Sequence, residues 1–435
     1  MGLEAFPYAV GHMLEATNLG QQPGTLLGSI CRGERLKLGT KELEEEGGWV
    51  APPAYVKPVF LAVTALYWLS LYFYVPILSP YVEFSGGTLE MAGLVVSAYG
   101  LAQLILRIPL GMWSDRLGKR RPFLALGFLA NVASCLVFVS VTDPWLMVGG
   151  RFLAGVAACA WVAFSVLFAS YFPPGHAARA MSYITFCNST SVMMATFTGG
   201  WVADQGGWLA PFWLSAGVGI LGLVGVAFVY ERPSVLREVP SIGARLRSVM
   251  AYPEVVFASL VAALGQYVAF ATHFGFLPNY AVSIGASKTE LGILTMLGML
   301  SIASITLISG TVLAPRIGPK RTIFIAYLLV SASTAVIPLV DFIEGLYIVQ
   351  VIGGFGRGAA YPILMGLSIA RLPDSEKATA MGFFQAVYAI GMFAGPVGAG
   401  WIGGQWGYGP LFWSTACVAV LTAVAALRLP GKAES

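Results

Sequence analysis

From residue 55 onward, the chain alternates long apolar runs with short polar loops. Each run has about the 20 residues that an α-helix needs to cross a bilayer. The pattern predicts twelve transmembrane helices, at residues 55–82, 88–113, 121–141, 144–171, 177–203, 208–230, 254–283, 287–314, 320–340, 343–370, 377–403 and 408–429. We therefore expect an all-α integral membrane protein.

A repeat with a period of 200 residues divides these helices into two sets of six. Several pairs keep this spacing: Ala180-Met181 and Ala380-Met381, Gly200-Trp201 and Gly400-Trp401, and Phe212-Trp213 and Phe412-Trp413. Repeated halves are typical of secondary transporters, in which two bundles move about a site near the bilayer midplane. We expect two pseudo-symmetric six-helix bundles, at residues 55–231 and 254–430, joined by a polar linker at 232–253.

Residues 1–54 differ from the rest of the chain because they are rich in glutamate and contain no long apolar run. They lack the basic region followed by an apolar region that marks a signal peptide. We interpret them as a mobile cytoplasmic extension and assign them no function.

Composition supports a membrane protein and argues against other classes. Hydrophobic residues make up 57% of the chain and charged residues 11%, whereas ordinary globular domains have about 25% charged residues. The net charge of +4 is too small to indicate nucleic-acid binding. The five cysteines are scattered, and no motif typical of a metal site or of a membrane-embedded hydrolase is present. We expect no cofactor, no metal and no enzymatic activity.

The distribution of cations predicts the orientation in the membrane. Loops after even-numbered helices and the C-terminal tail carry many of them, among them Arg116, Arg120, Arg245, Arg316 and Lys432, whereas loops after odd-numbered helices carry only Lys288. Cations collect on the cytoplasmic side of membrane proteins. Both termini are therefore expected to be cytoplasmic.

One polar turn, residues 111–121, carries a recognisable motif. It reads Gly-x-x-x-Asp-Arg-x-Gly-x-Arg-Arg between two apolar spans, which resembles the loop between helices 2 and 3 of the major facilitator superfamily. A basic turn without further function is the alternative. The resemblance covers nearly all of residues 55–430 and is strongest to twelve-helix bacterial permeases. It implies a prokaryotic cytoplasmic membrane and alternating access.

The same resemblance implies a cytoplasmic gate at this turn. Its members are Gly111, Asp115, Arg116, Gly118, Arg120 and Arg121. The carboxylate of Asp115 is expected to meet the positive N-terminal end of helix 11, near Ala378. Gly111 would allow close packing there, and the arginines would bind acidic or carbonyl groups. In the second half Pro315 stands where Asp115 stands, so we expect an asymmetric gate.

Two arginines lie inside predicted spans, Arg151 in helix 4 and Arg357 in helix 10. A charge inside a membrane span is a functional candidate because its burial is costly. In the superfamily these helices line the central cavity. No acidic residue lies in the middle of any span, so a cationic cavity would favour an anionic substrate. For Arg151 the alternative is a structural role, in which it binds backbone carbonyls between helices.

Other polar residues form a candidate set for substrate and proton binding. His273 is the one histidine within a span, and imidazole can carry a proton. A structural histidine near the outer end of helix 7 is the alternative, and a carboxylate at a helix end is the other candidate proton carrier. Gln266 precedes it by seven residues and is expected on the same helical face. The remaining candidates are Tyr67, Tyr74, Asn188, Tyr361, Gln385 and Tyr388. Helix packing is the alternative role for each of these. Arg107, four residues before Gly111, is expected to support the gate.

The sequence thus predicts a monomeric secondary transporter in the lipid bilayer that moves a small organic solute, coupled to protons. Export of a drug-like compound or metabolite is slightly favoured. A Gly-x-x-x-Gly-Pro motif of the family's antiporters stands in helix 11 instead of helix 5, which argues against drug/proton antiport. The alternatives are a permease for an organic anion that uses Arg357 and Arg151, and a membrane sensor that has lost transport.

Overall fold

Apolar runs of the chain form helices throughout the region that the structure describes. The computed structural model describes residues 51–173, 176–231, 242–370 and 372–429, and every element in these ranges is helical. We call residues 56–226 the N-terminal half. Its helices are α4 (Val56–Tyr72), α5 (Val75–Phe84), α6 (Leu89–Leu117), α7 (Arg121–Ser140), α8 (Pro144–Cys159), α9 (Trp161–Ala169), α10 (Ala177–Gly206) and α11 (Ala210–Val226).

The C-terminal half repeats this plan with two wide turns inserted. After the short helix α12 (Ile242–Met250) come α13 (Pro253–Ala271), the π-helix η1 (Thr272–Phe276), α14 (Leu277–Ser283), α15 (Lys288–Ile308), the π-helix η2 (Ser309–Leu313), α16 (Ala314–Ile317), α17 (Pro319–Val336), the 3-10 helix η3 (Ile337–Leu339), α18 (Ile343–Leu367), α19 (Asp374–Trp406) and α20 (Tyr408–Ala426).

These elements combine into the twelve predicted spans. Among the described residues, nine helical segments are long and apolar enough to cross a membrane, such as Val56–Phe84 and Pro253–Ser283. Helix α11 is apolar but has 17 residues. Helices α10 and α18 have 30 and 25 residues and carry more polar and small side chains. The prediction of an all-α protein with twelve long helical segments is confirmed.

The repeat of 200 residues is also present in the backbone. Gly118 and Gly318, which follow α6 and α16, have φ angles of 61° and 88°. Gly207 and Gly407 end α10 and α19 with φ angles of 82° and 81°. Such positive φ angles favour glycine because it has no Cβ atom. The two halves therefore turn the chain in the same way at matching positions.

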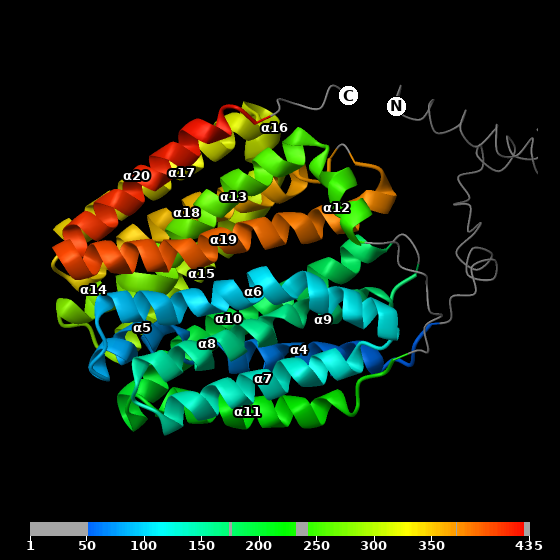
Figure 1. The fold of residues 1–435 in the computed structure, drawn as a ribbon, viewed down its shortest axis with the longest axis horizontal. Coiled ribbons are helices and arrows are strands. Elements are labelled where there is room, and N and C mark those ends of the chain that lie inside the picture. The colour runs from blue at the N-terminus through cyan, green and yellow to red at the C-terminus, as the bar shows by residue number, and fades with distance from the viewer. Residues whose placement is uncertain (1–50, 174–175, 232–241, 371, 430–435) are drawn as a thin grey trace, which may run out of the picture. The chain divides into compact units, whose positions relative to one another are not determined.

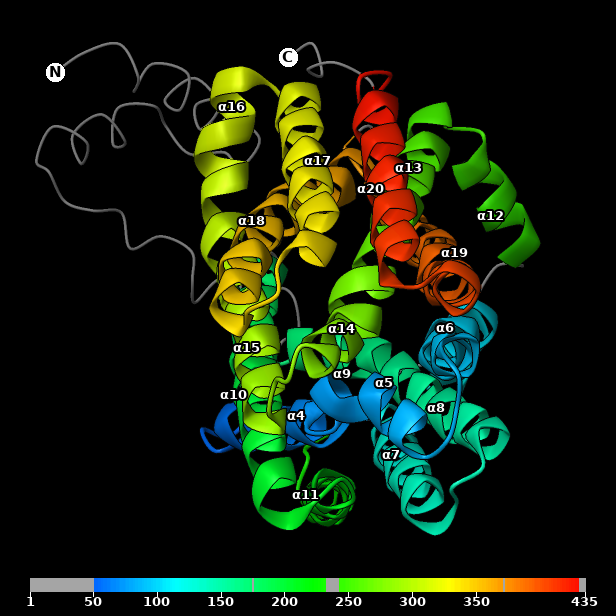
Figure 2. The same cartoon turned by 90° about the vertical axis from the view of Figure 1, so that its left-hand side faces the viewer.

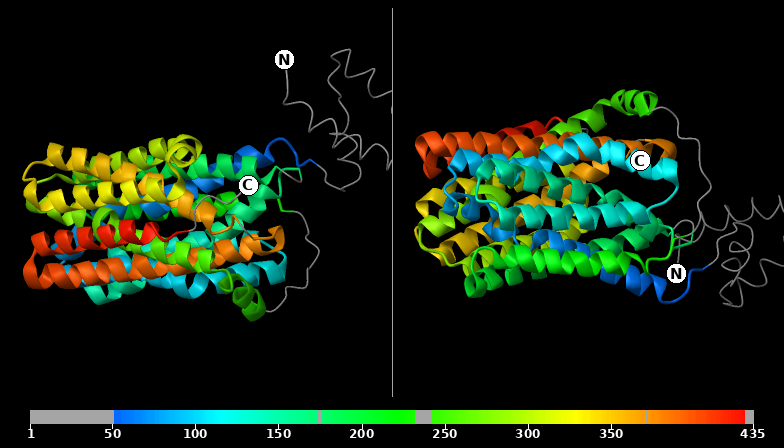
Figure 3. Two further views of the ribbon diagram at one scale, coloured as in Figure 1. Left: turned by 90° about the horizontal axis from the view of Figure 1, so that it is seen from above. Right: turned by 60° about the horizontal axis from the view of Figure 1, so that its bottom comes forward.

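Two pairs of helices join the halves. The helices run roughly parallel, with α6 beside α19 and α10 beside α15 (Figure 1, Figure 2 and Figure 3). Glycines allow the backbones to touch: a Cβ atom at Gly93 would lie 2.3 Å from the carbonyl oxygen of Pro396, and one at Gly200 would lie 2.4 Å from that of Lys288. Both glycines lie far along their helices from the basic turn. We call their end of the helices the opposite end, and the end that carries residues 111–121 the basic end.

Carboxylates at the opposite end also join the two halves. Asp204 of α10 accepts hydrogen bonds from the backbone N–H groups of Lys288 (3.1 Å) and Thr289 (2.9 Å), at the start of α15. Gln405 donates to Glu90 at 3.3 Å, and Asn279 donates to Glu83. These acidic side chains, which lie at span ends, therefore have structural partners across the interface.

The predicted linker is described in part. Residues 1–50 and 232–241, which belong to the predicted extension and linker, lie outside the described residues. Helix α12 packs Val249 against Val255, Leu372 and Ala380. The linker thus reaches the N-terminal part of α19, where the hydroxyl of Ser248 also donates a hydrogen bond to Glu376.

Candidate gate and central site

The basic turn begins where α6 ends at Leu117 and Gly118 reverses the chain. Arg116 is exposed, and the guanidinium of Arg120 donates to the hydroxyl of Ser114. The side chains of Asp115 and Ala378 lie outside the described residues. The contact of the Asp115 carboxylate with the start of α19 therefore stays a prediction.

Gly111 is not in a close helix contact in this conformation. A Cβ atom there would meet a methyl group of Val162 at 3.8 Å, an ordinary contact within the N-terminal half. By contrast, Gly100 of the same helix has the backbone of Met392 at 2.7 Å from its ideal Cβ position. The close approach of α6 to α19 thus lies toward the opposite end, and the tight packing expected at Gly111 is not observed among the described residues.

Glu231, which the sequence analysis did not select, holds the basic turn. Its carboxylate accepts hydrogen bonds from the backbone N–H groups of Arg120 and Arg121, the latter at 3.1 Å. These groups open α7, where a helix has unpaired donors and a positive dipole. The guanidinium of Arg121 in turn donates to the carbonyl of Ala227 at 2.8 Å. The turn is therefore fastened to the end of α11, as expected for arginines that bind carbonyl groups.

Replacing Glu231 by alanine is expected to destabilise the N-terminal half. The change leaves two backbone donors without their acceptor, which costs about 2 kcal/mol. The thermal unfolding midpoint of the purified protein should fall. Glu344→Ala is the control, because Glu344 is an exposed glutamate in the first turn of α18 with no hydrogen bond to its carboxylate within the described residues. Equal midpoints for the two variants would contradict the role of Glu231.

Arg107 joins the two halves near their middle. Its side chain is 7% exposed, and its Nη1 donates to Oε1 of Gln103 and, at 3.4 Å, to the hydroxyl of Tyr388. Gln103 donates onward to the carbonyl of Tyr99 at 3.4 Å. Arg107 was expected to support the gate, and its guanidinium contacts Tyr388 in the middle of α19, away from the basic turn. Its position inside an apolar span was the signal that could have identified it.

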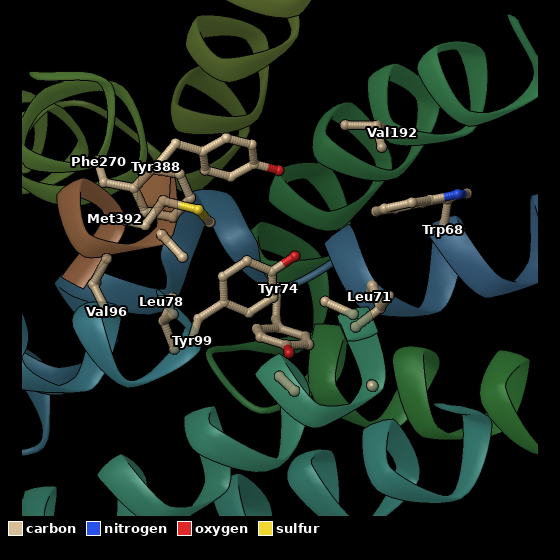
Figure 4. Packing of buried hydrophobic residues seen from close by; sticks show 14 of the residues in the cluster. Trp68, Leu71, Tyr74, Leu78, Val96, Tyr99, Val192, Phe270, Tyr388 and Met392 are labelled. Atoms are coloured by element: carbon tan, nitrogen blue, oxygen red, sulfur yellow. The ribbon is translucent and has the colours of Figure 1, made fainter. Parts of the chain in front are cut away.

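Aromatic rings from both halves surround this contact. The ring of Tyr388 lies 6.1 Å from that of Tyr361 and 5.7 Å from that of Phe384. The rings of Tyr99 and Phe270 stack across the two halves with centroids 6.3 Å apart. Figure 4 shows Tyr99 and Tyr388 with their hydroxyl groups on the side toward Trp68. Two separate candidates, Tyr361 and Tyr388, are therefore brought together at the interface of the halves.

Arg151 belongs to the interior of the N-terminal half. It donates to the hydroxyl of Tyr74 at 3.2 Å, and its guanidinium carbon lies 4.5 Å from the centroid of the Tyr99 ring. Tyr74 is fully buried against Phe212. Tyr67 is also fully buried, and its hydroxyl donates to the carbonyl of Ala157. Tyr67 and Tyr74 therefore pack inside one half, whereas the partners found for Arg151 are a tyrosine hydroxyl and an aromatic ring and not the backbone carbonyls of its alternative role.

Arg357 and His273 form a relay through Gln350 in the C-terminal half. Arg357 donates to Oε1 of Gln350 at 2.8 Å, and Nε2 of Gln350 contacts Nδ1 of His273. Arginine has no acceptor, so the amide oxygen must face it and the amide nitrogen must donate to the imidazole. Nδ1 is thus an acceptor, and the ring carries its single proton on Nε2. Gly298 of α15 leaves room for this pair, since a Cβ atom there would lie 2.7 Å from His273.

The other candidates are more dispersed. Gln266 is half-buried on α13, whereas His273 is 1% exposed in the π-helix η1. A wide π turn shifts the helical register, so the seven-residue spacing does not bring Gln266 into the His273 relay. Asn188 of α10 and Gln385 of α19 are half-buried, and the structure places neither in the polar clusters described above.

The helices thus form two halves, which glycine contacts join at one end and the contact of Arg107 with Tyr388 joins in the middle. The family profile described as Major Facilitator Superfamily matches residues 60–343 and 255–435. The chain therefore belongs to the major facilitator superfamily. It is a multi-pass membrane protein.

Individual relatives are distant. The uncharacterized transporter BU466 of Buchnera aphidicola is 25% identical over 182 residues, which cover 41% of this chain and 46% of that protein. This chain thus spans about half the length of the first curated relatives it matches. YceJ, an uncharacterized MFS-type transporter of Bacillus subtilis, is 26% identical, and the alignment covers 69% of this chain and 77% of the length of YceJ. The quinolone resistance protein NorA of Staphylococcus aureus is 32% identical over 28% of this chain and 31% of its own.

Solved structures share the fold. A bacterial homologue of the human lysosomal transporter Spinster, in an inward-facing and unoccupied conformation, superposes with a TM-score of 0.69 and 17% sequence identity. The alignment covers 87% of this chain and 96% of that one. This likeness confirms the arrangement of helices in the two halves.

Proposed function

We propose that this transporter moves a small organic solute across the membrane by alternating access of its two halves. The observation that carries the proposal is the uneven interface. Backbones touch at Gly93, Gly100 and Gly200, toward the opposite end, whereas Gly111 makes an ordinary contact inside its own half. Such an interface suits halves that separate at one end and close at the other.

The predicted orientation gives the two ends their roles. If the cations mark the cytoplasmic side, the opposite end faces outward and is closed in this conformation. The protein would then lie in a prokaryotic cytoplasmic membrane as a monomer, with both termini inside. The gate at Asp115 would close the basic end in the alternate state.

We further propose that protons drive transport through His273. Protonation of Nδ1 would place its hydrogen against the amide nitrogen of Gln350, where two donors repel each other. The amide would then turn, and Arg357 would lose its acceptor. A proton on His273 therefore changes the contacts of α18, which gives the proton a way to bias one conformation over the other.

Export of a drug-like compound or metabolite is the direction we favour. The partial similarity to the quinolone resistance protein NorA supports a drug-like solute. The second candidate, a permease that binds an organic anion with Arg151 and Arg357 together, has less support. Arg151 contacts Tyr74 and Tyr99 in one half, and Arg357 contacts Gln350 in the other. The two arginines therefore have separate partners in this conformation.

Solute flux in reconstituted vesicles tests the function. We expect a pH gradient to drive accumulation of a solute from a panel of organic anions, lipophilic cations and neutral metabolites, and a protonophore to abolish it. Flux that ignores the gradient would contradict proton coupling. Ligand binding without any flux by the folded protein would favour the sensor alternative.

A further inference from the structure

The guanidinium of Arg107 lacks an anionic partner. Its Nη1 holds two neutral acceptors, Gln103 and Tyr388, and its Nε is buried with no hydrogen-bond partner among the described residues. A buried charge is costly unless it is paired. The neutral amide and phenol do not cancel the positive charge of the Arg107 guanidinium, so this charge is buried without a counterion.

Nearby carboxylates of the same helices are too distant to complete it. Helix geometry places Glu90 about 25 Å and Asp115 about 12 Å from Arg107 along α6. On α19, Glu376 lies about 18 Å before Tyr388, and it accepts a hydrogen bond from Ser248. The anion that suits Arg107 is therefore best supplied by a ligand.

The surroundings of Arg107 define the rest of such a ligand. Tyr388 is 8% exposed, and Tyr361 is half-buried beside it. The rings of Tyr361, Phe384 and Tyr388 lie within 6.2 Å of one another. Aromatic surfaces of this kind pack against flat rings in offset or edge-to-face geometry. An aromatic body next to a single anionic group would match both features.

We propose that Arg107, Tyr388 and Tyr361 form a subsite for an aromatic monocarboxylate. The planar guanidinium fork matches the two oxygens of a carboxylate. The hydroxyl of Tyr388 accepts from Arg107, so its own hydrogen can be donated to the same carboxylate. A single cation suits one negative charge better than a dianion such as a phosphate monoester. The proposal rests on the proposed transport function and narrows its substrate class.

The subsite would be formed by residues of both halves, so its geometry would change when the halves separate. Arg107 belongs to α6, whereas Tyr361 and Tyr388 belong to α18 and α19. A carboxylate between them would replace the long contact of 3.4 Å between Arg107 and Tyr388 with two charge-assisted hydrogen bonds. The bound substrate would therefore hold the two halves together near their middle.

Binding to the purified full-length protein tests the subsite. Benzoate and indole-3-acetate serve as probes, and benzamide and indole-3-acetamide serve as neutral isosteres. We expect the acids to bind at least about tenfold more tightly than the amides. Arg107→Gln should remove this preference, and Tyr388→Phe should weaken acid binding by a smaller factor. Arg321→Gln, which removes an exposed cation of the second basic turn, should bind as the wild type does.

Two outcomes would overturn the subsite. One is equal binding of acids and amides by the wild type, and the other is unchanged acid binding by Arg107→Gln. If Arg107→Gln does not fold, Arg107→Lys and Tyr388→Phe decide, since they keep the charge or the ring and should still weaken acid binding. Flux of neutral or cationic solutes without acid binding would refute the subsite alone. Acid binding with no flux of any solute would refute transport alone.

Discussion

Replacing His273 by asparagine is expected to abolish solute accumulation driven by a pH gradient, while exchange of solute without a gradient continues. Asparagine can place an acceptor oxygen near the position of Nδ1, so Gln350 keeps its partner and Arg357 keeps its contact with Gln350. The amide side chain does not titrate, so the conformational bias from the proton is lost. Accumulation and exchange are measured in the same reconstituted vesicles.

The matched control is His176→Asn. His176 is exposed near the start of α10, so its replacement removes an imidazole ring without touching the relay. Accumulation that survives in His273→Asn would show that another group carries the proton. Loss of both accumulation and exchange, with the thermal midpoint unchanged, would instead assign His273 to solute binding.

Gly93→Val is expected to force the halves apart at the opposite end and to reduce transport by about tenfold. The ideal Cβ position lies 2.3 Å from the carbonyl oxygen of Pro396, which is backbone and cannot rotate away. Overpacking of this kind costs about 1–3 kcal/mol, and 1.4 kcal/mol changes a population by a factor of about ten. Gly149→Val is the control, since no atom lies within 4 Å of its Cβ position.

Spin labels report the separation directly. Thr88 and Ser283 are exposed at the opposite end, one in each half, and can be replaced by cysteine in a background without the native cysteines. The distance distribution between the labels should shift to longer values in Gly93→Val and stay unchanged in Gly149→Val. An unchanged distribution in both variants would mean that Gly93 does not control closure of this end.

Local patterns in the sequence were sufficient to predict the helices and the basic turn at residues 111–121. Apolar length predicted the spans because the membrane imposes one length on all of them. The repeat places glycines at matching positions of the two turns, and both Gly118 and Gly318 have positive φ angles. The hydrogen bond of the Arg121 guanidinium to the carbonyl of Ala227 also followed from a basic turn that must satisfy its cations nearby.

Partners in the central region were not predictable in the same way. The contact of Arg107 with Tyr388 joins residues 281 positions apart, and no spacing rule links them. The pairing of Gln266 with His273 assumed a regular α-helix, whereas the π-helix at Thr272–Phe276 changes the register. Tyr67 and Tyr74 were candidates for a pocket, yet their rings fill the core of one half. Whether a ring faces a core or an interface depends on neighbouring helices that the sequence of one span does not specify.

Gln350 cannot accept hydrogen bonds from Arg357 and from a protonated His273 at the same time. An amide has one donor end and one acceptor end, so it can serve an arginine on one side only while the imidazole on the other side stays neutral. A glutamate in its place would accept hydrogen bonds from both neighbours at once. Gln350→Glu would thus allow His273 to stay protonated while Arg357 remains bound. With glutamine at position 350, His273 would release its proton in each transport cycle. With glutamate there, His273 would retain the proton.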